Sequence, residues 1–504
     1  MNNFKYILGL VLLIAVSLVS CSSDKDKDKK SDEEGEDGNK DAVTAYVTTS
    51  TRSLEFAKQE IAFSSVTDNM SPLTITLNSS EQFQTMDGFG AAITGSTAYN
   101  LLKMSQGDRS KFLKETFSES EGMGQSYVRI AIGCSDFSLS EYTCCDKKGI
   151  ENFALQDEEL KYVIPVLKEI LAVNPNLKIM GSPWTPPLWM KVNNLKELKP
   201  YESWTSGQLN PAYYQDYATY FVKWIEAMKS NGINIYSITP QNEPLNRGNS
   251  ASMFMGWEEQ NAFVRDALGP KFKEAGLTTK IYLYDHNYDY DSSKEDTKDQ
   301  GQYPLKIYRD AETAKYVAGA AYHNYGGNKA ELLTIHNANP EKELIFTETS
   351  IGTWNDGRNF EKRLIEDMEE VALGTVNNWC KGVMVWNLML DSERGPFRPG
   401  GCDVCYGAVD IDKANYKTIT RNSHYFIVGH LSSVVKAGAV RIGTSGYTNS
   451  DLIYSAFKNT DNSYAFVILN KSAAPKRVNF YDGVKSFVHE VPAKAVVSYR
   501  WSNK

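Results

Sequence analysis

Two glutamates stand where a pair of carboxyl groups could break a carbon–oxygen bond. Glu243 ends the segment NIYSITPQNE, and Glu348 lies in the segment ELIFTETS. One carboxyl group can protonate a leaving oxygen atom, while the other attacks the carbon atom or stabilises positive charge on it. The sequence shows no HExxH motif, no phosphate-binding glycine loop and no Ser-His-Asp arrangement. The paired glutamates are therefore the strongest catalytic signal in the chain.

Aromatic, amide and charged side chains occur together with the two glutamates at the ends of predicted strands. These side chains belong to Arg129, Trp184, Asn242, His323, Tyr325 and Trp386. Two carboxyl groups among aromatic faces and amides fit the hydrolysis of a glycosidic bond, whose transition state carries positive charge. The tryptophans could instead be packing residues of a large core. Asp136 and His286 could face the same site or support it through hydrogen bonds.

Strand-like and helix-like segments alternate through the middle of the chain and predict a (β/α)8 TIM barrel. The eight strand-like segments are residues 86–94, 125–133, 177–184, 234–243, 280–287, 316–325, 343–350 and 382–390. Helical patterns cover residues 158–174 and 213–232, and residues 422–438 read as the closing helix. A barrel of this kind places its active site at the carboxyl ends of its strands, where the two glutamates fall.

The two ends of the chain show a different pattern, in which apolar and polar residues alternate. This pattern covers residues 72–86 before the barrel and residues 452–472, 476–484 and 493–501 after it. Alternation of this kind predicts antiparallel strands with one buried face. We therefore expect a side β-sandwich built from both termini, with residues 44–85 and 438–504 flanking a catalytic barrel of residues 86–437.

The first 43 residues read as targeting and tether sequence rather than fold. Residues 1–21 contain Lys5, a short apolar run and a final Leu-Val-Ser-Cys, which resembles the lipobox of bacterial lipoproteins with Cys21 as the lipidated residue. Residues 22–43 are almost entirely charged and small, so they predict a solvated tether. We expect an exported lipoprotein at the outer membrane or cell surface of a Gram-negative bacterium, held to the membrane through its lipid anchor only. An uncleaved transmembrane anchor is the alternative, but the apolar run is short.

The net charge and the cysteines indicate which kinds of partner, disulfide and metal site the sequence predicts. The net charge is −8 and no basic stripe is visible, so a nucleic acid partner is not expected, and neither is a cofactor. Cys402 and Cys405 could form a local disulfide, whereas the adjacent Cys144 and Cys145 are expected to pair elsewhere. A zinc site at the single CxxC is the alternative, but no second ligand pair follows it, and no catalytic metal is expected. We expect a monomer.

Several motifs together resemble family 30 glycoside hydrolases, specifically their glucosylceramidase-like branch. They include DGFGAAIT, VRIAIGCSDFS, GSPWTPPLWMK, ITPQNEP, IFTET and VMVWNLMLDSERGP, and the resemblance runs from about Pro72 to Lys504. It implies that Glu243 is the acid/base, that Glu348 is the nucleophile of a retaining reaction, and that Arg129 keeps Glu348 ionised. Asn242 would bind the sugar 2-hydroxyl. The remaining four residues, Trp184, His323, Tyr325 and Trp386, would line a glucose pocket.

One departure from the family pattern bears on the substrate. Gly95 stands where glucosylceramidases commonly carry an aspartate that holds the far side of glucose, so its presence would open the pocket toward a longer glucan. We therefore expect a retaining β-glycosidase that hydrolyses β-1,6-linked glucan by double displacement. The alternatives are a glucosylceramidase, a broader β-glucosidase or β-xylosidase, or a surface lipoprotein that binds carbohydrate without catalysis or serves only as structure.

Overall fold

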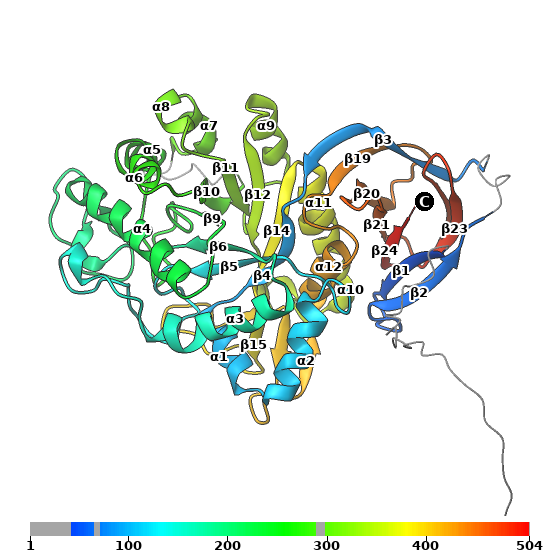
Figure 1. The fold of residues 1–504 in the computed structure, drawn as a ribbon, viewed down its shortest axis with the longest axis horizontal. Coiled ribbons are helices and arrows are strands. Elements are labelled where there is room, and N and C mark those ends of the chain that lie inside the picture. The colour runs from blue at the N-terminus through cyan, green and yellow to red at the C-terminus, as the bar shows by residue number, and fades with distance from the viewer. Residues whose placement is uncertain (1–41, 65–70, 289–297, 503–504) are drawn as a thin grey trace, which may run out of the picture. The chain divides into compact units, whose positions relative to one another are not determined.

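The computed structural model describes residues 42–64, 71–288 and 298–502 and shows a closed parallel barrel (Figure 1). Around the barrel the strand order is β10-β11-β12-β14-β4-β5-β6-β9. The strands are β4 (Gly88–Ala92), β5 (Tyr127–Ala131), β6 (Lys178–Ser182), β9 (Ser237–Ile238), β10 (Lys280–Asn287), β11 (Gly319–His323), β12 (Glu343–Glu348) and β14 (Cys380–Asn387). Seven of the eight predicted segments contain one of these strands in full, and residues 382–390 overlap β14, which begins two residues earlier. The predicted barrel is confirmed.

Helices connect the barrel strands and cover the outside of the barrel. Their bounds are α1 (Gly95–Lys103), α2 (Gln106–Phe117), α3 (Ile164–Val173), α4 (Tyr214–Ser230), α5 (Trp257–Phe263), α6 (Gly269–Glu274), α7 (Tyr303–Tyr308), α8 (Ala311–Ala314), α9 (Ala330–Ala338), α10 (Phe360–Asp367), α11 (Leu373–Asn377) and α12 (Ser423–Ser432). π-helical turns at Glu159–Val163, Val264–Leu268 and Met368–Ala372 extend three of them. In α4, Tyr217, Phe221, Trp224 and Met228 are buried at helical spacing, which fixes the face that packs on the barrel.

Short strands and single turns shape the loops at the carboxyl ends of the barrel strands. The pairs are β7 (Lys191–Val192) with β8 (Gln208–Leu209), and β13 (Ile351–Gly352) with β16 (Cys405–Tyr406). A third small sheet contains β15 (Met389–Asp391), β17 (Val409–Ile411) and β18 (Ile419–Arg421). The 3-10 turns are Ile150–Asn152, Leu188–Met190, Pro211–Tyr213 and Thr353–Asn355. These pieces hold long loops in place where a barrel forms its site.

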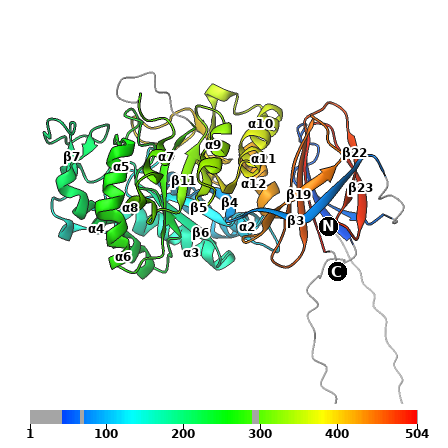
Figure 2. The ribbon, with the colours of Figure 1, turned by 90° about the horizontal axis from the view of Figure 1, so that it is seen from above.

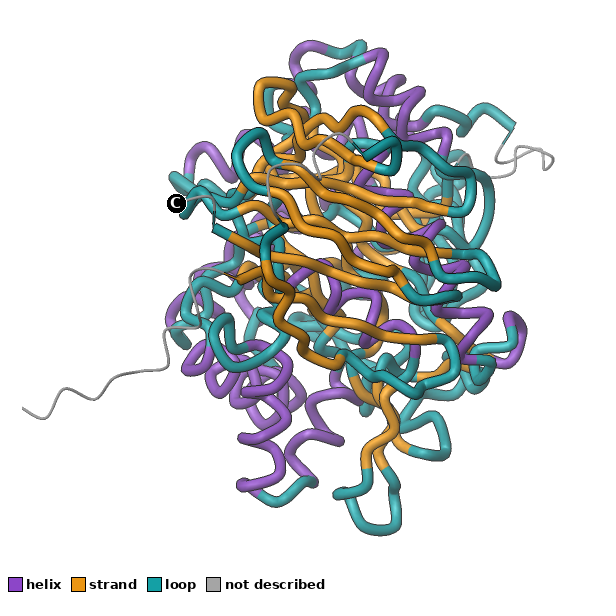
Figure 3. Tube along the Cα trace, turned by 90° about the vertical axis from the view of Figure 1, so that its right-hand side faces the viewer, coloured by secondary structure: helices purple, strands orange, loops and turns teal. Residues whose placement is uncertain are grey.

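Strands from both termini build the side β-sandwich, as predicted (Figure 3). Its hydrogen-bonded order is β2-β1-β24-β21-β20-β19-β3-β22-β23. The bounds are β1 (Ala42–Thr49), β2 (Ala57–Ala62), β3 (Thr74–Thr85), β19 (Val440–Gly446), β20 (Leu452–Lys458), β21 (Tyr464–Asn470), β22 (Lys476–Tyr481), β23 (Ser486–Val491) and β24 (Ala495–Trp501). Strand β1 lies between β2 and β24, and β3 lies between β19 and β22, so the N-terminal segment is built into the sheet with strands from the C-terminal part of the chain.

The N-terminal boundary lies slightly earlier than the sequence predicted. Strand β1 begins at Ala42, and Val43 is fully buried and pairs with Ile61. The predicted tether of residues 22–43 therefore ends inside a strand, because a single buried valine beside charged residues gives no alternation to detect. The rest of the tether, residues 1–21 and Cys21 lie outside the described residues. Within the described ranges, no helix is both long enough and apolar enough to span a bilayer.

The last barrel helix joins the barrel to the sandwich (Figure 2). In α12, His430 is fully buried, and its two ring nitrogens pair with Thr48 Oγ1 at 2.8 Å and Ser498 Oγ at 2.9 Å. Burial lowers the pKa of His430 to about 3, so the ring is neutral and can donate one of these bonds and accept the other. One side chain thus connects the barrel to strands from both ends of the chain.

Candidate active site

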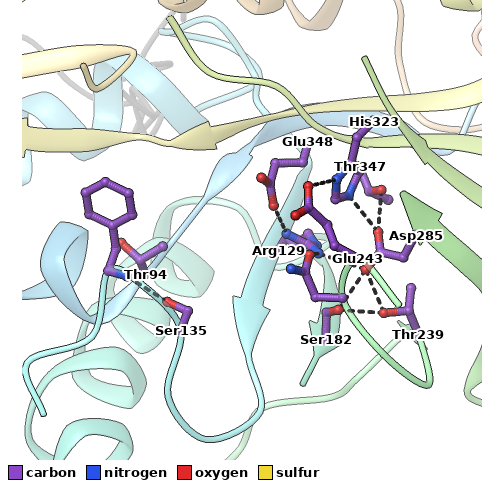
Figure 4. A network of polar contacts seen from close by, with 12 residues as sticks. Thr94, Arg129, Ser135, Ser182, Thr239, Glu243, Asp285, His323, Thr347 and Glu348 are labelled. Carbon is purple, nitrogen blue, oxygen red and sulfur yellow. Dashed lines mark hydrogen bonds and ion pairs between the residues drawn. The ribbon is translucent and has the colours of Figure 1, made fainter. Parts of the chain in front are cut away.

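The two glutamates lie at the carboxyl ends of two barrel strands and face one cavity (Figure 4). Glu348 is the last residue of β12, and Glu243 follows β9 in a left-handed conformation with φ 45°. That conformation is uncommon for a residue with a side chain. It is held by the backbone N–H of Glu243, which donates to Asp285 O at 2.9 Å, and by the backbone N–H of Asn242, which donates to Pro183 O at 2.8 Å.

Glu348 is oriented by two donors, one on strand β5 and one in the loop after β11. Arg129 Nη1 donates to Glu348 Oε2 at 2.6 Å, and the hydroxyl of Tyr325 donates to Glu348 Oε1 at 3.0 Å. The guanidinium of Arg129 is fully buried against the rings of Trp184 and Trp386, 5.0 and 5.4 Å from their centroids. Burial and the nearby Glu243 raise the pKa of Glu348 against the opposing effect of Arg129. His323 and Arg129 are thus the two cations that favour the ionised form that a nucleophile needs.

Asp285 is the hub of the polar network, and the sequence analysis missed it. It accepts hydrogen bonds from Arg129 Nη2 at 2.8 Å and pairs with His323 Nε2 at 3.0 Å. Burial alone would raise the pKa of Asp285, but these two groups hold it well below its usual range. Three hydroxyl groups also donate to it, those of Ser182, Thr239 and Thr347, at 2.7, 2.8 and 2.6 Å.

A local irregularity explains why Asp285 was missed. The pairing of β10 with β11 shifts register between Tyr284 and His286, and both Tyr284 and Asp285 have positive φ. A bulge of this kind turns a side chain toward a direction that simple alternation does not predict. The signal that could have found Asp285 is the set of hydroxyl residues Ser182, Thr239 and Thr347 in otherwise apolar strand segments.

Glu243 is surrounded by donors on its cavity side. His323 Nδ1 lies 3.1 Å from Glu243 Oε1, while Asn246 and Asn249 donate to Glu243 Oε2 at 2.8 and 3.2 Å. Burial opposes the ionisation of Glu243, but His323, His286 and Asn246 outweigh it and lower its pKa to about 2. Burial would likewise lower the pKa of His323, yet the surrounding carboxylates raise it to about 9. The proton of this pair therefore rests on His323 in the unliganded site.

The cavity has a volume of about 350 Å³, within the range of small-ligand sites. Its lining consists of Asp136, Glu243, Asn246, Asn249, His286, Asn287, Tyr325, Glu348, Trp354, Trp386, Gly400, Gly401, Cys402 and Cys405. Glu243, Glu348, Tyr325 and Trp386 thus line it as predicted, and Asp136 and His286 face it as well. Burial, Glu348 and Glu243 raise the pKa of Asp136 to about 8.

Four predicted site residues lie behind this lining. Arg129 and His323 have no exposed surface, Trp184 is 2% exposed and Asn242 is 4% exposed. Trp184 stacks on Trp386 with ring centroids 5.3 Å apart, so it supports the ring that faces the cavity. Asn242 Oδ1 accepts from Arg129 Nη2 at 2.6 Å, which fixes the orientation of its amide. In the unliganded site, Trp184 and His323 act through their neighbours rather than as wall residues.

The cysteine predictions have a mixed outcome. Cys402 and Cys405 form the predicted local disulfide, which lies in the cavity wall. Cys144 and Cys145, which were expected to pair elsewhere, are both unpaired and buried. Their sulfur atoms face oxygen atoms instead, at 3.6 Å from Glu159 Oε1 and 3.2 Å from Gly149 O. Neither thiol forms a disulfide among the described residues, so that expectation was wrong.

The inference drawn from Gly95 is also wrong. A Cβ atom built on Gly95 would lie 2.0 Å from Glu158 Oε1, so a side chain already occupies the space that was expected to be open. Glu158 immediately precedes the π-helical turn Glu159–Val163 and accepts a hydrogen bond from the backbone N–H of Leu139 at 2.7 Å. Position 95 therefore gives no argument for a longer substrate.

The structure is a parallel (β/α)8 barrel with a pair of glutamates at the carboxyl ends of β9 and β12. An arginine binds one of these glutamates, and tryptophans lie beside them. This combination is typical of the glycoside hydrolases that cleave through two carboxyl groups. The chain belongs to glycosyl hydrolase family 30. Residues 86–435 match the TIM-barrel domain of that family, and residues 438–499 match its beta sandwich domain.

The similar proteins include endo-1,6-glucanases and glucosylceramidases. An endo-1,6-beta-D-glucanase of Neurospora crassa is 32% identical over 416 residues, covering 79% of this chain and 81% of that protein. The mouse lysosomal acid glucosylceramidase is 28% identical over 463 residues, covering 85% and 83%. A solved structure described as an endo-beta1,6-glucanase has a TM-score of 0.89 and 63% identity, and the match covers 92% of this chain and all of that one.

Proposed function

We propose that this enzyme is an endo-acting β-1,6-glucanase that retains the anomeric configuration. The observation that carries the reaction is the convergence of Glu243 and Glu348 on one cavity, with Arg129 and Tyr325 bound to Glu348. The linkage is supported by the similarity to endo-1,6-glucanases, which reaches 63% identity over 92% of the chain. The linkage is supported by these relatives alone, because Glu158 fills the space beside Gly95.

In the first step, a carboxylate oxygen of Glu348 attacks the anomeric carbon while Glu243 protonates the leaving oxygen. The bond from carbon to the leaving oxygen breaks, and a glycosyl ester to Glu348 forms. In the second step, Glu243 takes a proton from a water molecule, whose oxygen displaces Glu348 and restores the free carboxylate. Arg129 and Tyr325 hold the two oxygens of Glu348 in line for both steps.

His323 supplies the proton that Glu243 needs for the first step. Its Nδ1 lies 3.1 Å from Glu243 Oε1, so one transfer along this hydrogen bond converts the imidazolium–carboxylate pair into a neutral imidazole and a carboxylic acid. In the unliganded site the negative charge of Glu348 raises the pKa of His323. Esterification of Glu348 removes that charge and so lowers the pKa of His323. The same pair accepts the proton of the water molecule in the second step.

Asn242 is placed to bind the sugar 2-hydroxyl. Its Oδ1 accepts from Arg129, so its Nδ2 is the end of the amide that can donate to the substrate. Such a contact strengthens as charge develops on the sugar ring in the transition state. Arg129 therefore positions both the nucleophile Glu348 and the amide of Asn242, which binds the sugar.

Glucosylceramide cleavage is the second candidate, because a mammalian glucosylceramidase matches this chain over 85% of its length. The deciding experiment digests β-1,6-, β-1,3- and β-1,4-glucans and glucosylceramide, and sizes the early products. We expect a ladder of oligosaccharides from β-1,6-glucan alone. Release of glucose only would contradict endo action, and turnover of glucosylceramide without turnover of β-1,6-glucan would favour the second candidate.

We also propose that the enzyme is a monomeric lipoprotein, tethered through Cys21 at the outer membrane or cell surface. The support is the apolar run that ends in Leu-Val-Ser-Cys and the charged segment that follows it. A tethered hydrolase of this kind acts on polysaccharide outside the cytoplasm.

A further inference from the structure

Three side chains that can bind a metal ion converge on the cavity from three neighbouring segments. They are Glu243 after β9, His286 in β10 and His323 at the end of β11. One ligand atom from each lies within 4.8 Å of the other two. Glu243 Oε1 is 3.1 Å from His323 Nδ1 and 4.0 Å from His286 Nδ1. Two imidazoles and one carboxylate form a ligand set that zinc accepts in proteins.

The residues around these three groups orient them as outer-shell partners of a metal site do. His323 Nε2 pairs with Asp285 Oδ1 at 3.0 Å, which turns Nδ1 of the same ring toward Glu243. Asn246 and Asn249 bind Glu243 Oε2, which leaves Oε1 directed at the two imidazoles. The ligand atoms of Glu243 and His323 are therefore fixed by hydrogen bonds made on their far sides.

The charge of the site favours a cation. Glu243, Asp285 and Glu348 place three carboxyl groups beside two cations, the guanidinium of Arg129 and the protonated imidazole of His323, and His323 gives up its proton when an ion binds. All of these groups are buried, so their excess negative charge is poorly screened by water. Because Glu243 and His286 line the open cavity, an ion can enter and keep a position for a water molecule or another exchangeable ligand.

We propose that Glu243, His286 and His323 form an inhibitory binding site for a divalent transition-metal ion, with zinc as the representative. The ion binds Glu243 Oε1 and one nitrogen of each imidazole, and the proton that lies between Glu243 and His323 leaves to solvent. Zinc bonds to nitrogen and oxygen of about 2.0–2.2 Å require the ligand atoms to approach one another to roughly 3.5 Å. The 4.0 Å pair, His286 Nδ1 and Glu243 Oε1, must therefore close by less than about 1 Å.

The consequence is a reversible block of the reaction. An oxygen atom of Glu243 that is bound to zinc can neither give a proton to the leaving oxygen nor take one from water. The ion also occupies space in the cavity that the sugar needs. Zinc and substrate should therefore exclude each other, although zinc plays no part in the glycosidase reaction itself.

Calorimetry on the full-length protein tests the site without relying on activity. We expect zinc chloride to bind with one ion per chain and a dissociation constant in the micromolar range. The variants His286→Asn and Glu243→Gln should each weaken binding by about tenfold or more, since each removes one ligand. His489→Asn is the matched control, because His489 contacts Tyr499 in the sandwich and should leave zinc affinity unchanged.

A second arm measures hydrolysis of an aryl β-glucoside by the wild-type enzyme. Zinc should inhibit, substrate should compete with it, and EDTA should restore the full rate. Absence of binding at 1 mM zinc, about a thousand times a micromolar dissociation constant, would overturn the proposal. So would unchanged binding in both His286→Asn and Glu243→Gln. The calorimetric result stands apart from the glucanase assignment, because it does not depend on which glucan the enzyme cleaves.

Discussion

At the scale of single residues, the roles of the two glutamates follow from their neighbours. Glu348 is bound by a permanent cation and a phenol, whereas Glu243 is bound by a histidine that can exchange a proton with it. The first arrangement suits a group that must stay ionised, and the second suits a group that must cycle between two protonation states. The difference lies in Arg129 and His323 rather than in the glutamates.

We expect Glu348→Gln to abolish turnover of every substrate and Glu243→Gln to be selective. Loss of the acid should slow the cleavage of glucan by about 10²–10⁴-fold. It should spare the first step for an aryl glucoside with a good leaving group, which departs without a proton. Burst kinetics with both substrates check this. Equal losses on the activated and the unactivated substrate would contradict the assignment of Glu243.

Trp354 is an aromatic residue at the rim of the cavity that the sequence analysis did not single out. It lies in the 3-10 turn after β13, lines the cavity and is 50% exposed. We expect Trp354→Ala to lower kcat/KM on glucan by about fivefold to tenfold through lost stacking on a sugar. Hydrolysis of an aryl glucoside should change little. Tyr481→Ala, in sandwich strand β22, is the control.

A second variant tests the same ring without removing it. The ring of Trp354 packs over Gly352, where an added Cβ atom would lie 1.8 Å from Trp354 Cζ3. Gly352→Ala should therefore displace the ring and reproduce the selective loss on glucan. If both variants cleave glucan at the wild-type rate, Trp354 is not a binding platform.

At the scale of elements, the start of α1 packs against Glu158, which immediately precedes the π-helical turn before α3. Gly95 begins α1, and the carboxyl group of Glu158 fills the space where its side chain would be. We expect Gly95→Ala to lower the free energy of unfolding by about 1–3 kcal/mol, because the added Cβ atom forces the buried glutamate to move. Urea denaturation measures this. Gly107→Ala is the control, since a Cβ atom there meets nothing within 4 Å.

The same glutamate makes stability depend on pH. Burial raises the pKa of Glu158 from 4.5 to about 7. Between these two pH values Glu158 binds more protons in the folded protein than in the unfolded chain. The contribution of Glu158 to stability is therefore highest below pH 4.5 and falls as pH rises toward 7. The loss from this group is about 3 kcal/mol at most.

Thermal melts of the wild type and of Glu158→Gln across pH 5–8 test this linkage. Glutamine keeps an oxygen atom that can accept from Leu139 and cannot ionise. The Tm of the variant should therefore rise relative to the Tm of the wild type as pH increases, and the difference should level off above pH 7. A difference that is constant with pH would show that Glu158 is not protonated in the folded protein.

At the scale of the whole molecule, the sandwich is tied to the barrel at several points. His430 connects α12 to β1 and β24, and Gln84 at the end of β3 donates to Val376 O at 2.6 Å and Cys380 O at 3.1 Å. Because β1 and β3 both lie inside the sandwich sheet, removing either terminus would expose its core. We infer that the barrel and the sandwich unfold together.

The proposed anchor should be separable from catalysis. We expect Cys21→Ala to release the protein from the membrane fraction and leave its turnover of an aryl glucoside unchanged, since the first residues of the folded part are in β1 of the sandwich. Fractionation followed by an assay measures both properties. Retention in the membrane fraction, or a loss of activity on the small substrate, would contradict the proposed tether.

The sequence by itself determined the barrel, the sandwich and the two glutamates. Alternating strand-like and helix-like segments are local patterns, and a (β/α)8 barrel brings the carboxyl ends of its strands to one face whatever the loops do. Glu243 and Glu348 could therefore be paired across 105 residues of chain from strand order alone. Trp386 and Tyr325 followed from the same reasoning, whereas the disulfide of Cys402 with Cys405 was predicted from their spacing in the chain.

Only the tertiary structure decided which groups touch. Asp285 became the hub because a bulge in β10 turns it inward, Glu158 filled the space beside Gly95 from another element, and His286 joined Glu243 and His323 across three strands. Each of these contacts depends on strand register and side-chain direction between residues far apart in the chain. Local patterns carry no information on such distances, because a shift of one residue in register would point each side chain to the opposite face.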